Sequence, residues 1–200
     1  MTPFRVEAGL AAPLLLDNVD TDQLLPARFL RKPRGDGYHP WLFYDARYDA
    51  EGVPNPGFVL NQAPWQSARF LLSGANFGCG SSREGAVYAL VDAGIRAVLA
   101  PSFGDIFFNN ACKNGLLPVR LAPPQLSTIL NLGPVPITVD LEALAVRLPS
   151  GETLPFSLDP LARASMLEGL DDIGLTDRYA DAIQRFDQTR PRWLDIRSCP

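Results

Sequence analysis

Residues 68–121 read ARFLLSGANFGCGSSREGAVYALVDAGIRAVLAPSFGDIFFNNACKNGLLPVRL, and this stretch decides the fold class. It contains three short apolar runs with the length and composition of buried strands: 68–73, 96–100 and 116–121. Between them the sequence predicts two helices, one over about 82–93 and one that has Ser102 as its N-terminal cap. Strands and helices that alternate at this spacing are typical of βαβ units and indicate an α/β fold with a parallel sheet.

The flanks of this centre are less regular. Upstream, residues 4–8 alternate like a half-buried strand. Residues 31–64 are rich in proline and aromatic residues, and we expect an ordered loop there that covers a ligand or a partner. Downstream, the sequence predicts further elements: a short helix over 124–132, antiparallel strands over 137–141, 145–148 and 153–158, a helix capped by Asp159, and a last helix that opens at Gly174 and stops at Pro191. Because no repeat or linker divides the chain, we expect one domain over 1–200, with 31–64 as a loop insertion and 175–200 as a C-terminal helix and tail.

Composition excludes several classes of protein. The chain has 200 residues and a formal net charge of −4, which argues against a dedicated nucleic-acid-binding protein. No apolar run approaches the length of a membrane span. The three cysteines and the single histidine, His39, have no metal-ligand spacing, so we expect no metal site in this chain. Sparse, odd-numbered cysteines favour a reducing compartment, and we expect the protein to be cytoplasmic.

The sharpest chemical signal is the segment 76–84, NFGCGSSRE, which joins a predicted strand to a predicted helix. Its glycines allow a tight turn, and a helix N-terminus offers unpaired amides to an anion. Ser81, Ser82 and Arg83 add two hydroxyls and a guanidinium that can hold a carboxylate. The residues alone leave two interpretations open: an anion-binding site, or a helix capped by Ser81 through a capping box with Glu84.

Five segments in one consistent order resemble a known family. Residues 78–84 resemble the Gly-Ser-Ser-Arg-Glu-His motif of the swivelling domain of aconitase-type hydro-lyases. The other segments are similar to motifs of the small subunits of 3-isopropylmalate dehydratase: 18–30, 100–110, 113–118 and 169–176. The resemblance implies a three-layer β/β/α fold, with a partly parallel central sheet and a second antiparallel sheet. It also implies a large partner subunit that carries a 4Fe-4S cluster, since this chain lacks the cysteines to hold one.

The same resemblance implies an activity and roles for residues. The activity is the isomerisation of 2-isopropylmalate and 3-isopropylmalate, by dehydration and rehydration, in leucine biosynthesis. The first serine of the motif, Ser81, is implied as the catalytic base, and Ser82 and Arg83 are implied as contacts to substrate carboxylates. Arg28 is a further candidate for substrate binding, although an ion pair with Asp20 or Asp22 is the commoner role for an arginine in such a cluster.

One position departs from the family motif: Gly85 stands where the family has histidine. This change is compatible with a tolerated variation that leaves Ser81 and Arg83 in place. It is also compatible with a related small subunit for another hydroxy-dicarboxylate of the 2-methylmalate, dimethylmaleate or homoaconitate type. A third hypothesis, from another class of protein, is a non-catalytic interaction module that keeps the fold.

Overall fold

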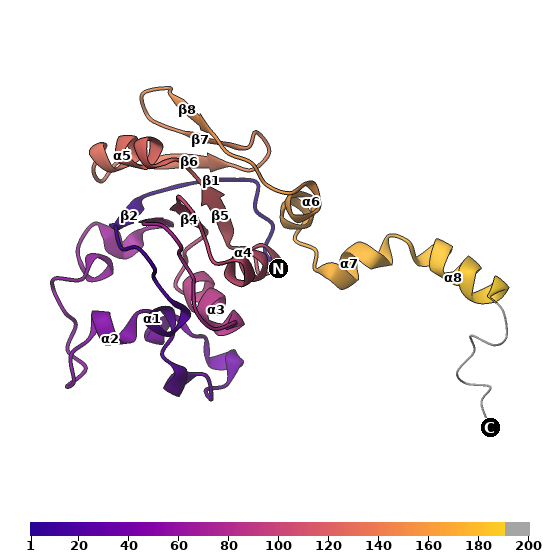
Figure 1. Cartoon of the computed structure of the whole chain (residues 1–200), viewed down its shortest axis with the longest axis horizontal. Coiled ribbons are helices and arrows are strands. Elements are labelled where there is room, and N and C mark those ends of the chain that lie inside the picture. The colour runs from indigo at the N-terminus through magenta and orange to yellow at the C-terminus, as the bar shows by residue number, and fades with distance from the viewer. Residues whose placement is uncertain (191–200) are drawn as a thin grey trace.

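The structure, a computed structural model, describes residues 1–190 and contains two four-stranded sheets with helices around them (Figure 1). The strands are β1 (Val6–Gly9), β2 (Ala11–Leu14), β3 (Phe70–Ser73), β4 (Ala97–Ala100), β5 (Leu117–Arg120), β6 (Ile137–Asp140), β7 (Ala145–Arg147) and β8 (Thr153–Pro155). The helices are α1 (Thr21–Leu24), α2 (Tyr44–Arg47), α3 (Glu84–Asp92), α4 (Asp105–Lys113), α5 (Pro123–Asn131), α6 (Pro160–Glu168), α7 (Asp172–Asp177) and α8 (Ala180–Thr189). Each strand and helix predicted within 68–121 is present.

The first sheet has the order β2-β3-β4-β5, and all of its neighbouring strands are parallel. Its register places Ala12 beside Leu71, and Leu71 beside Val98. The carboxyl ends of parallel strands meet at one edge of a sheet, so the segments that follow β2, β3 and β4 come together there. Strand β2 is an element that sequence analysis missed, because Pro13 interrupts its short apolar run.

The second sheet has the order β1-β6-β7-β8 and is antiparallel throughout. The three downstream strands are confirmed as β6, β7 and β8. The predicted N-terminal strand is confirmed as β1, which lies at the edge of this sheet and pairs with β6. The α/β fold with one parallel and one antiparallel sheet is therefore confirmed.

Side chains alternate between two apolar cores, as expected for buried strands. One core lies between the parallel sheet and the helices α3 and α4, and it includes Leu71, Val98 and Leu90. The other lies between the two sheets and includes Leu72, Leu99 and Val139. Helices, parallel sheet and antiparallel sheet thus form three layers, which Figure 1 shows from bottom to top.

The loop predicted over 31–64 packs onto the first of these cores. Leu42 and Phe43 are buried there, and short 3₁₀ turns alternate with α2 along the loop: Arg34–Asp36, His39–Trp41 and Val59–Asn61. His39 lies in one of these turns and is exposed. The loop is therefore part of the folded body of the protein.

The C-terminal region differs from its prediction. The sequence predicts one helix from Gly174, whereas the structure has two, α7 and α8, which meet at Arg178 and Tyr179. Asp171 caps α7 by accepting a hydrogen bond from the amide of Gly174, so the first helix begins earlier than predicted. The predicted stop at Pro191 and the tail lie outside the described residues, and the single domain over 1–200 stays a prediction.

Candidate functional site

Three loops meet at the carboxyl edge of the parallel sheet. They are the segments 17–20 after β2, 74–83 after β3 and 101–104 after β4. Single bridges continue the sheet pairing into the loops, between Asp20 and Cys79 and between Phe77 and Phe103. Two amide hydrogen bonds add to these contacts, from Gly78 to the carbonyl of Val19 (2.7 Å) and from Gly104 to the carbonyl of Phe77 (2.9 Å). Backbone hydrogen bonds therefore hold the three loops in place at this edge of the sheet.

Side chains tie the same loops together. The backbone N–H of Asn76 donates to the Ser102 hydroxyl at 2.8 Å, and its side-chain amide donates to Oδ1 of Asn18 at 2.8 Å. Both asparagines have positive φ, 59° and 55°, a conformation that asparagine tolerates better than most residues. The prediction that Ser102 caps α4 is wrong, because Gly104 is the N-cap residue of that helix and the Ser102 hydroxyl instead accepts from the next loop.

Thr21 holds the segment that carries Ser81. Its hydroxyl donates to the backbone carbonyl of Ser81 at 2.8 Å, and its backbone N–H donates to the carbonyl of Cys79 at 3.0 Å. The Thr21 side chain is 2% exposed, which shields these bonds from water. The short helix α1 is itself fixed by Asp20, whose side chain accepts from the amide of Gln23 in a capping box. Ser81 is therefore held through its backbone while its hydroxyl is left for other contacts.

Two glycines allow the loops after β3 and β4 to touch. Gly78 has a φ of +74°, and a Cβ built on it would lie 2.1 Å from Cγ of Phe107. A Cβ on Gly104 would lie 2.7 Å from the carbonyl oxygen of Gly78. These contacts bring the start of α4 against the loop that precedes α3, and a side chain at either position would force the loops apart.

A pocket of about 300 Å³ opens at this junction. Its lining comes from three segments: Thr21, residues 78–81 with Arg83, and residues 104–107. Helices α3 and α4 both begin at this pocket. Their first-turn backbone amides and the positive ends of their dipoles therefore lie beside it. Such an arrangement favours a bound carboxylate or phosphate.

Ser81 and Arg83 are the polar side chains of the predicted motif that reach this pocket. Ser81 is exposed, and among residues 1–190 its hydroxyl has no hydrogen-bond partner. The capping box predicted for Ser81 is wrong: α3 begins at Glu84, its N-cap residue is Arg83, and no side chain caps it. The guanidinium of Arg83 forms an ion pair with Asp22. Asp22 follows Thr21 in α1, so this ion pair links Arg83 to the loops held together by Thr21.

Comparison with known proteins agrees with this geometry. The family described as the aconitase C-terminal domain matches residues 1–124. The chain belongs to that family. It is also 47% identical over 191 residues to a 3-isopropylmalate dehydratase small subunit of Rhodospirillum centenum, with 94% of each chain covered. It is 45% identical over 203 residues to one of Rhodospirillum rubrum, with 98% of each covered. The chain therefore also belongs to the family of these small subunits.

A solved structure supports the same assignment of fold. The crystal structure of a 3-isopropylmalate dehydratase from Methanocaldococcus jannaschii superposes with a TM-score of 0.64 at 27% sequence identity. The superposition covers 90% of this chain and 99% of that one. The swivelling-domain fold implied by the five motifs is thereby confirmed for this aconitase-family chain.

Two predicted site residues lie outside the pocket of this family member. Ser82 is exposed and is not among the residues that line it. Arg28 forms a two-point ion pair with Asp45, in place of the predicted pairing with Asp20 or Asp22. The hydrogen bonds from Arg28 hold the pKa of the Asp45 carboxyl below its ordinary value. The guanidinium also lies 4.6 Å from the ring centroid of Phe29, so Arg28 is occupied by neighbours in the free chain.

Gly85 has a packing role that the sequence did not indicate. A Cβ at this position would lie 2.9 Å from Cδ2 of Leu25 and 3.1 Å from Cδ2 of Leu30. A side chain here would therefore point at the loop that follows α1, and position 85 is not part of the pocket lining. The geometry favours the interpretation of Gly85 as a variation that leaves the pocket in place.

Sequence analysis missed Thr21, Asp105 and Phe107 as residues of the pocket or its walls. Sequence analysis assigned no role to Thr21, and within the motif 100–110 it assigned a role only to Ser102, as a helix cap. One signal was available: segments that follow adjacent parallel strands share an edge, so the loop after β4 had to lie beside the loop after β3. The hydrogen bond between Thr21 and Ser81 had no sequence signal, because 60 positions separate the two residues.

The described residues lack the ligands for the iron–sulfur cluster that the family resemblance implies. Such clusters need several cysteine thiolates that converge. Within 1–190 the free cysteines are Cys79, half-buried in the pocket, and Cys112, buried in α4, and no three His, Cys, Asp or Glu side chains converge to hold a metal. The described part of the chain therefore does not fit the cluster, and its location on a partner subunit stays a prediction. None of the described helices is long and apolar enough to cross a membrane.

Proposed function

We propose that this chain is the small subunit of a 3-isopropylmalate dehydratase. Together with a large subunit, it interconverts 2-isopropylmalate and 3-isopropylmalate by dehydration and rehydration in leucine biosynthesis. The observation that carries the proposal is the near-complete match, over 94–98% of the chain, to relatives with that name. The intact pocket with Ser81 and Arg83 supports a catalytic subunit over a non-catalytic module.

The proposed reaction asks two things of this chain. A proton must leave a carbon atom of the substrate, and the carboxylates must be held so that the correct carbon faces the base. The Ser81 oxygen takes the proton in this scheme, and the adjacent helix N-termini stabilise negative charge on that oxygen. Arg83 binds a substrate carboxylate through its forked N–H groups. Asp22 holds the guanidinium in place before the substrate arrives.

The second half of the chemistry belongs to the partner. Hydroxide is a poor leaving group, and an iron–sulfur cluster held by the partner would supply the Lewis acid that activates it. In the rehydration, the hydroxyl group of a water would add to the carbon that lost the proton, and Ser81 would return its proton to the carbon that had carried the hydroxyl. The pocket on this chain is at the small end of the range for ligand sites, which suits a site completed by a second chain. The sparse thiols favour a reducing compartment, and we infer a cytoplasmic enzyme.

The test is anaerobic reconstitution with the large iron–sulfur subunit from the same source, assayed on 2- and 3-isopropylmalate and on 2-methylmalate. Wild-type chain is expected to restore turnover of isopropylmalate that neither subunit shows alone. Ser81→Ala should lower kcat by about 10²–10⁴-fold, the usual contribution of a general base. Arg83→Lys should raise KM, because a point charge cannot replace a fork. Ser127→Ala, on the outer helix α5, is the matched control and should change neither.

Three outcomes contradict parts of the proposal. Folded wild-type chain that restores no turnover overturns the function. Turnover confined to 2-methylmalate overturns the substrate. Near-normal kcat in Ser81→Ala removes that serine from the role of base.

A further inference from the structure

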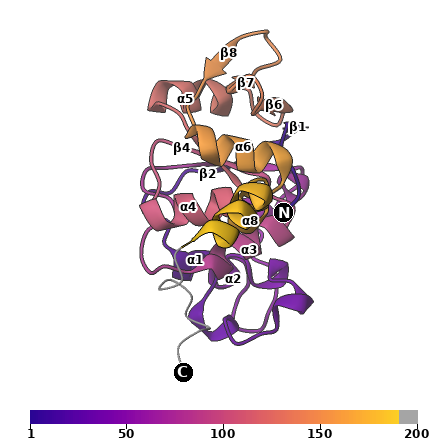
Figure 2. The same ribbon diagram turned by 90° about the vertical axis from the view of Figure 1, so that its right-hand side faces the viewer.

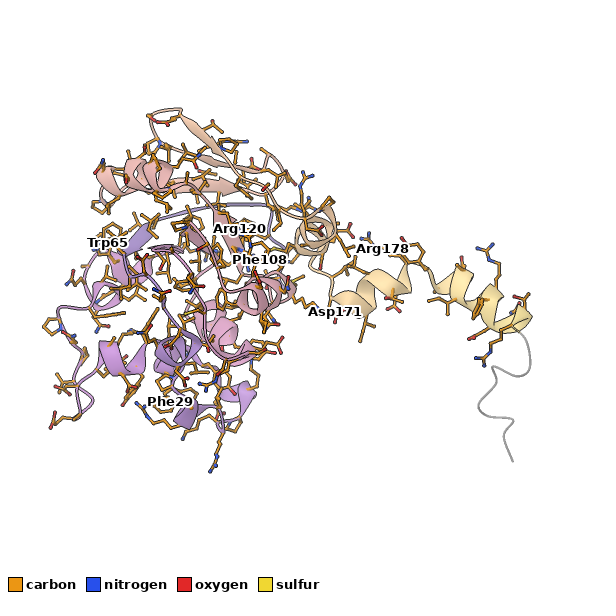
Figure 3. The ribbon with its side chains drawn as sticks, viewed as in Figure 1. Phe29, Trp65, Phe108, Arg120, Asp171 and Arg178 are labelled. Atoms are coloured by element: carbon orange, nitrogen blue, oxygen red, sulfur yellow. The ribbon has the colours of Figure 1, made fainter. Side chains whose placement is uncertain are left out.

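The C-terminal arm, residues 171–190, projects from the three-layered body (Figure 1). Figure 2, which looks along the arm, shows α4 and α6 on the face from which it leaves. Asp171 and Arg178 lie at the two ends of α7 (Figure 3), and Arg178 forms an ion pair with Glu168 at the end of α6. The base of the arm is thus tied to the body, whereas every residue of α8 is exposed.

Helix α8 has one apolar and one polar face. Tyr179, Ile183 and Phe186 follow the i, i+4, i+7 spacing of a single helix face, and they are 67%, 44% and 59% exposed. The polar side chains of the helix gather on the opposite side: Asp181, Gln184, Arg185 and Gln188. Three large apolar side chains on one face are the pattern of a helix that docks into a groove of another protein.

A free helix of this length is not stable on its own. Isolated helices shorter than about 12–15 residues are marginal in water, and α8 spans Ala180–Thr189. Helices in proteins obtain most of their stability from packing an amphipathic face. The fold of α8 therefore implies a surface that covers Tyr179, Ile183 and Phe186, and the described residues of this chain do not provide it.

The comparisons indicate which kind of protein has this arm. The aconitase C-terminal domain match ends at residue 124, well before the arm. The small-subunit relative from Rhodospirillum rubrum, in contrast, aligns with 98% of this chain, so the aligned part includes the arm. The sequence of the arm therefore aligns with that of a chain named as a small subunit, a name that implies a separate partner chain.

The candidate site connects to the arm through α4. The first turn of α4, Asp105–Phe107, lines the site pocket. Its last turns, with Asn109 and Lys113, line a second pocket of about 330 Å³ together with α6 and Leu175 of α7. Ile106, at the rim of the site pocket, is itself 52% exposed. A partner that covers the site pocket therefore meets a continuous surface that runs along α4 to the base of the arm.

We propose that the arm is a docking element for the large subunit, with Tyr179, Ile183 and Phe186 inserted into an apolar groove of that subunit. This inference rests on the proposed function, because it takes its partner from there. The ion pair of Arg178 with Glu168 links the base of the arm to α6, and α8 supplies the apolar contact.

The experiment compares three full-length chains: wild type, the double variant Ile183→Ser with Phe186→Ser, and the control double variant Gln184→Ser with Gln188→Ser on the polar face. Each is titrated anaerobically against the large iron–sulfur subunit, and Kd, kcat at saturating small subunit and the melting temperature of the free chain are measured. The apolar-face variant should raise Kd by about 100-fold, the scale expected for truncated hot-spot residues. It should leave kcat at saturation and the melting temperature unchanged, and the control should match wild type throughout.

The outcomes separate this inference from the proposed function. Restored turnover with wild type, but equal Kd for all three chains, overturns the docking role and leaves the function standing. No turnover with wild type overturns the function itself. Sedimentation of the free chain tests a second copy as the occupant: a dimer that dissociates in the apolar-face variant overturns the large subunit as the partner.

Discussion

Replacing Thr21 by valine tests whether the hold on the Ser81 backbone matters for catalysis. Valine keeps the shape of threonine but removes the hydroxyl that donates to the Ser81 carbonyl at 2.8 Å. A buried hydrogen bond contributes about 1 kcal/mol to the free energy of unfolding. For a chain of this length, that loss lowers the melting temperature by about 2–4 °C. Freed from this bond, the loop lets the Ser81 oxygen move, and a displacement near 1 Å costs about 10²-fold in rate.

We therefore expect Thr21→Val to lower kcat by about 10–100-fold in the reconstituted enzyme. KM should change little, because Arg83 is held by Asp22 and not by Thr21. Thr21→Ser is the matched control: it keeps the hydroxyl and deletes one buried methyl group, which costs about 0.8 kcal/mol. The two variants should thus be destabilised to a similar extent in thermal unfolding, but Thr21→Ser should keep a kcat near that of wild type. Equal kcat values for the two would refute a positioning role for the Thr21 hydroxyl.

Two further predictions concern the framework and its thiols. Gly78→Ala should lower the free energy of unfolding by more than about 2 kcal/mol, because its Cβ would lie 2.1 Å from Phe107. The control Gly94→Ala has a φ of +86° and open space around it, so it should cost about 1–2 kcal/mol for backbone strain alone. Chemical denaturation measures both free energies, and similar losses would contradict the packing argument. Burial raises the pKa of the Cys112 thiol to about 12, so at pH 8 almost none of it is thiolate. Iodoacetamide should therefore label Cys79 well before Cys112 in peptide maps of the folded protein. Rapid labelling of Cys112 would contradict its burial in α4.

Local pattern was enough to predict the centre of the fold. The runs that became β3, β4 and β5 are short, apolar and bounded by turn residues, and the helices between them end at glycines, so each element could be assigned from its own sequence. Strand β2 escaped because Pro13 interrupts its apolar run and because its neighbour in the sheet, β3, lies far along the chain. The boundary between α7 and α8 was not predicted, because the apolar spacing of Ile173, Ile183 and Phe186 is compatible with one continuous helix or with two.

The candidate site was predictable in its motif but not in its contacts. Ser81 and Arg83 were found because they lie in one segment with two glycines. The ion pairs were not, because the acidic partner of a surface arginine depends on which loops pass nearby. Arg28 pairs with Asp45, 17 positions away, and Arg83 pairs with Asp22, 61 positions away. Periodicity carries no information about such pairs, whereas the fold brings them together.

These ion pairs bear on how a dicarboxylate would enter the site. Both arginines that were predicted to bind substrate are already paired with carboxylates of this chain, Arg83 with Asp22 and Arg28 with Asp45. A substrate carboxylate must therefore share or displace an existing partner, and the two cases differ in what they require. The Asp22 side chain is half exposed and the Arg83 side chain is 20% exposed. One N–H group of the guanidinium can therefore keep its bond to Asp22 while the others face the pocket. Arg28 and Asp45 are both more than half exposed, and a pair of that kind contributes at most about 1 kcal/mol, which a partner surface or a ligand can easily offset. We therefore expect Arg83 to be the arginine that binds a substrate carboxylate, because it already lines the pocket, whereas Arg28 would need to leave Asp45 first.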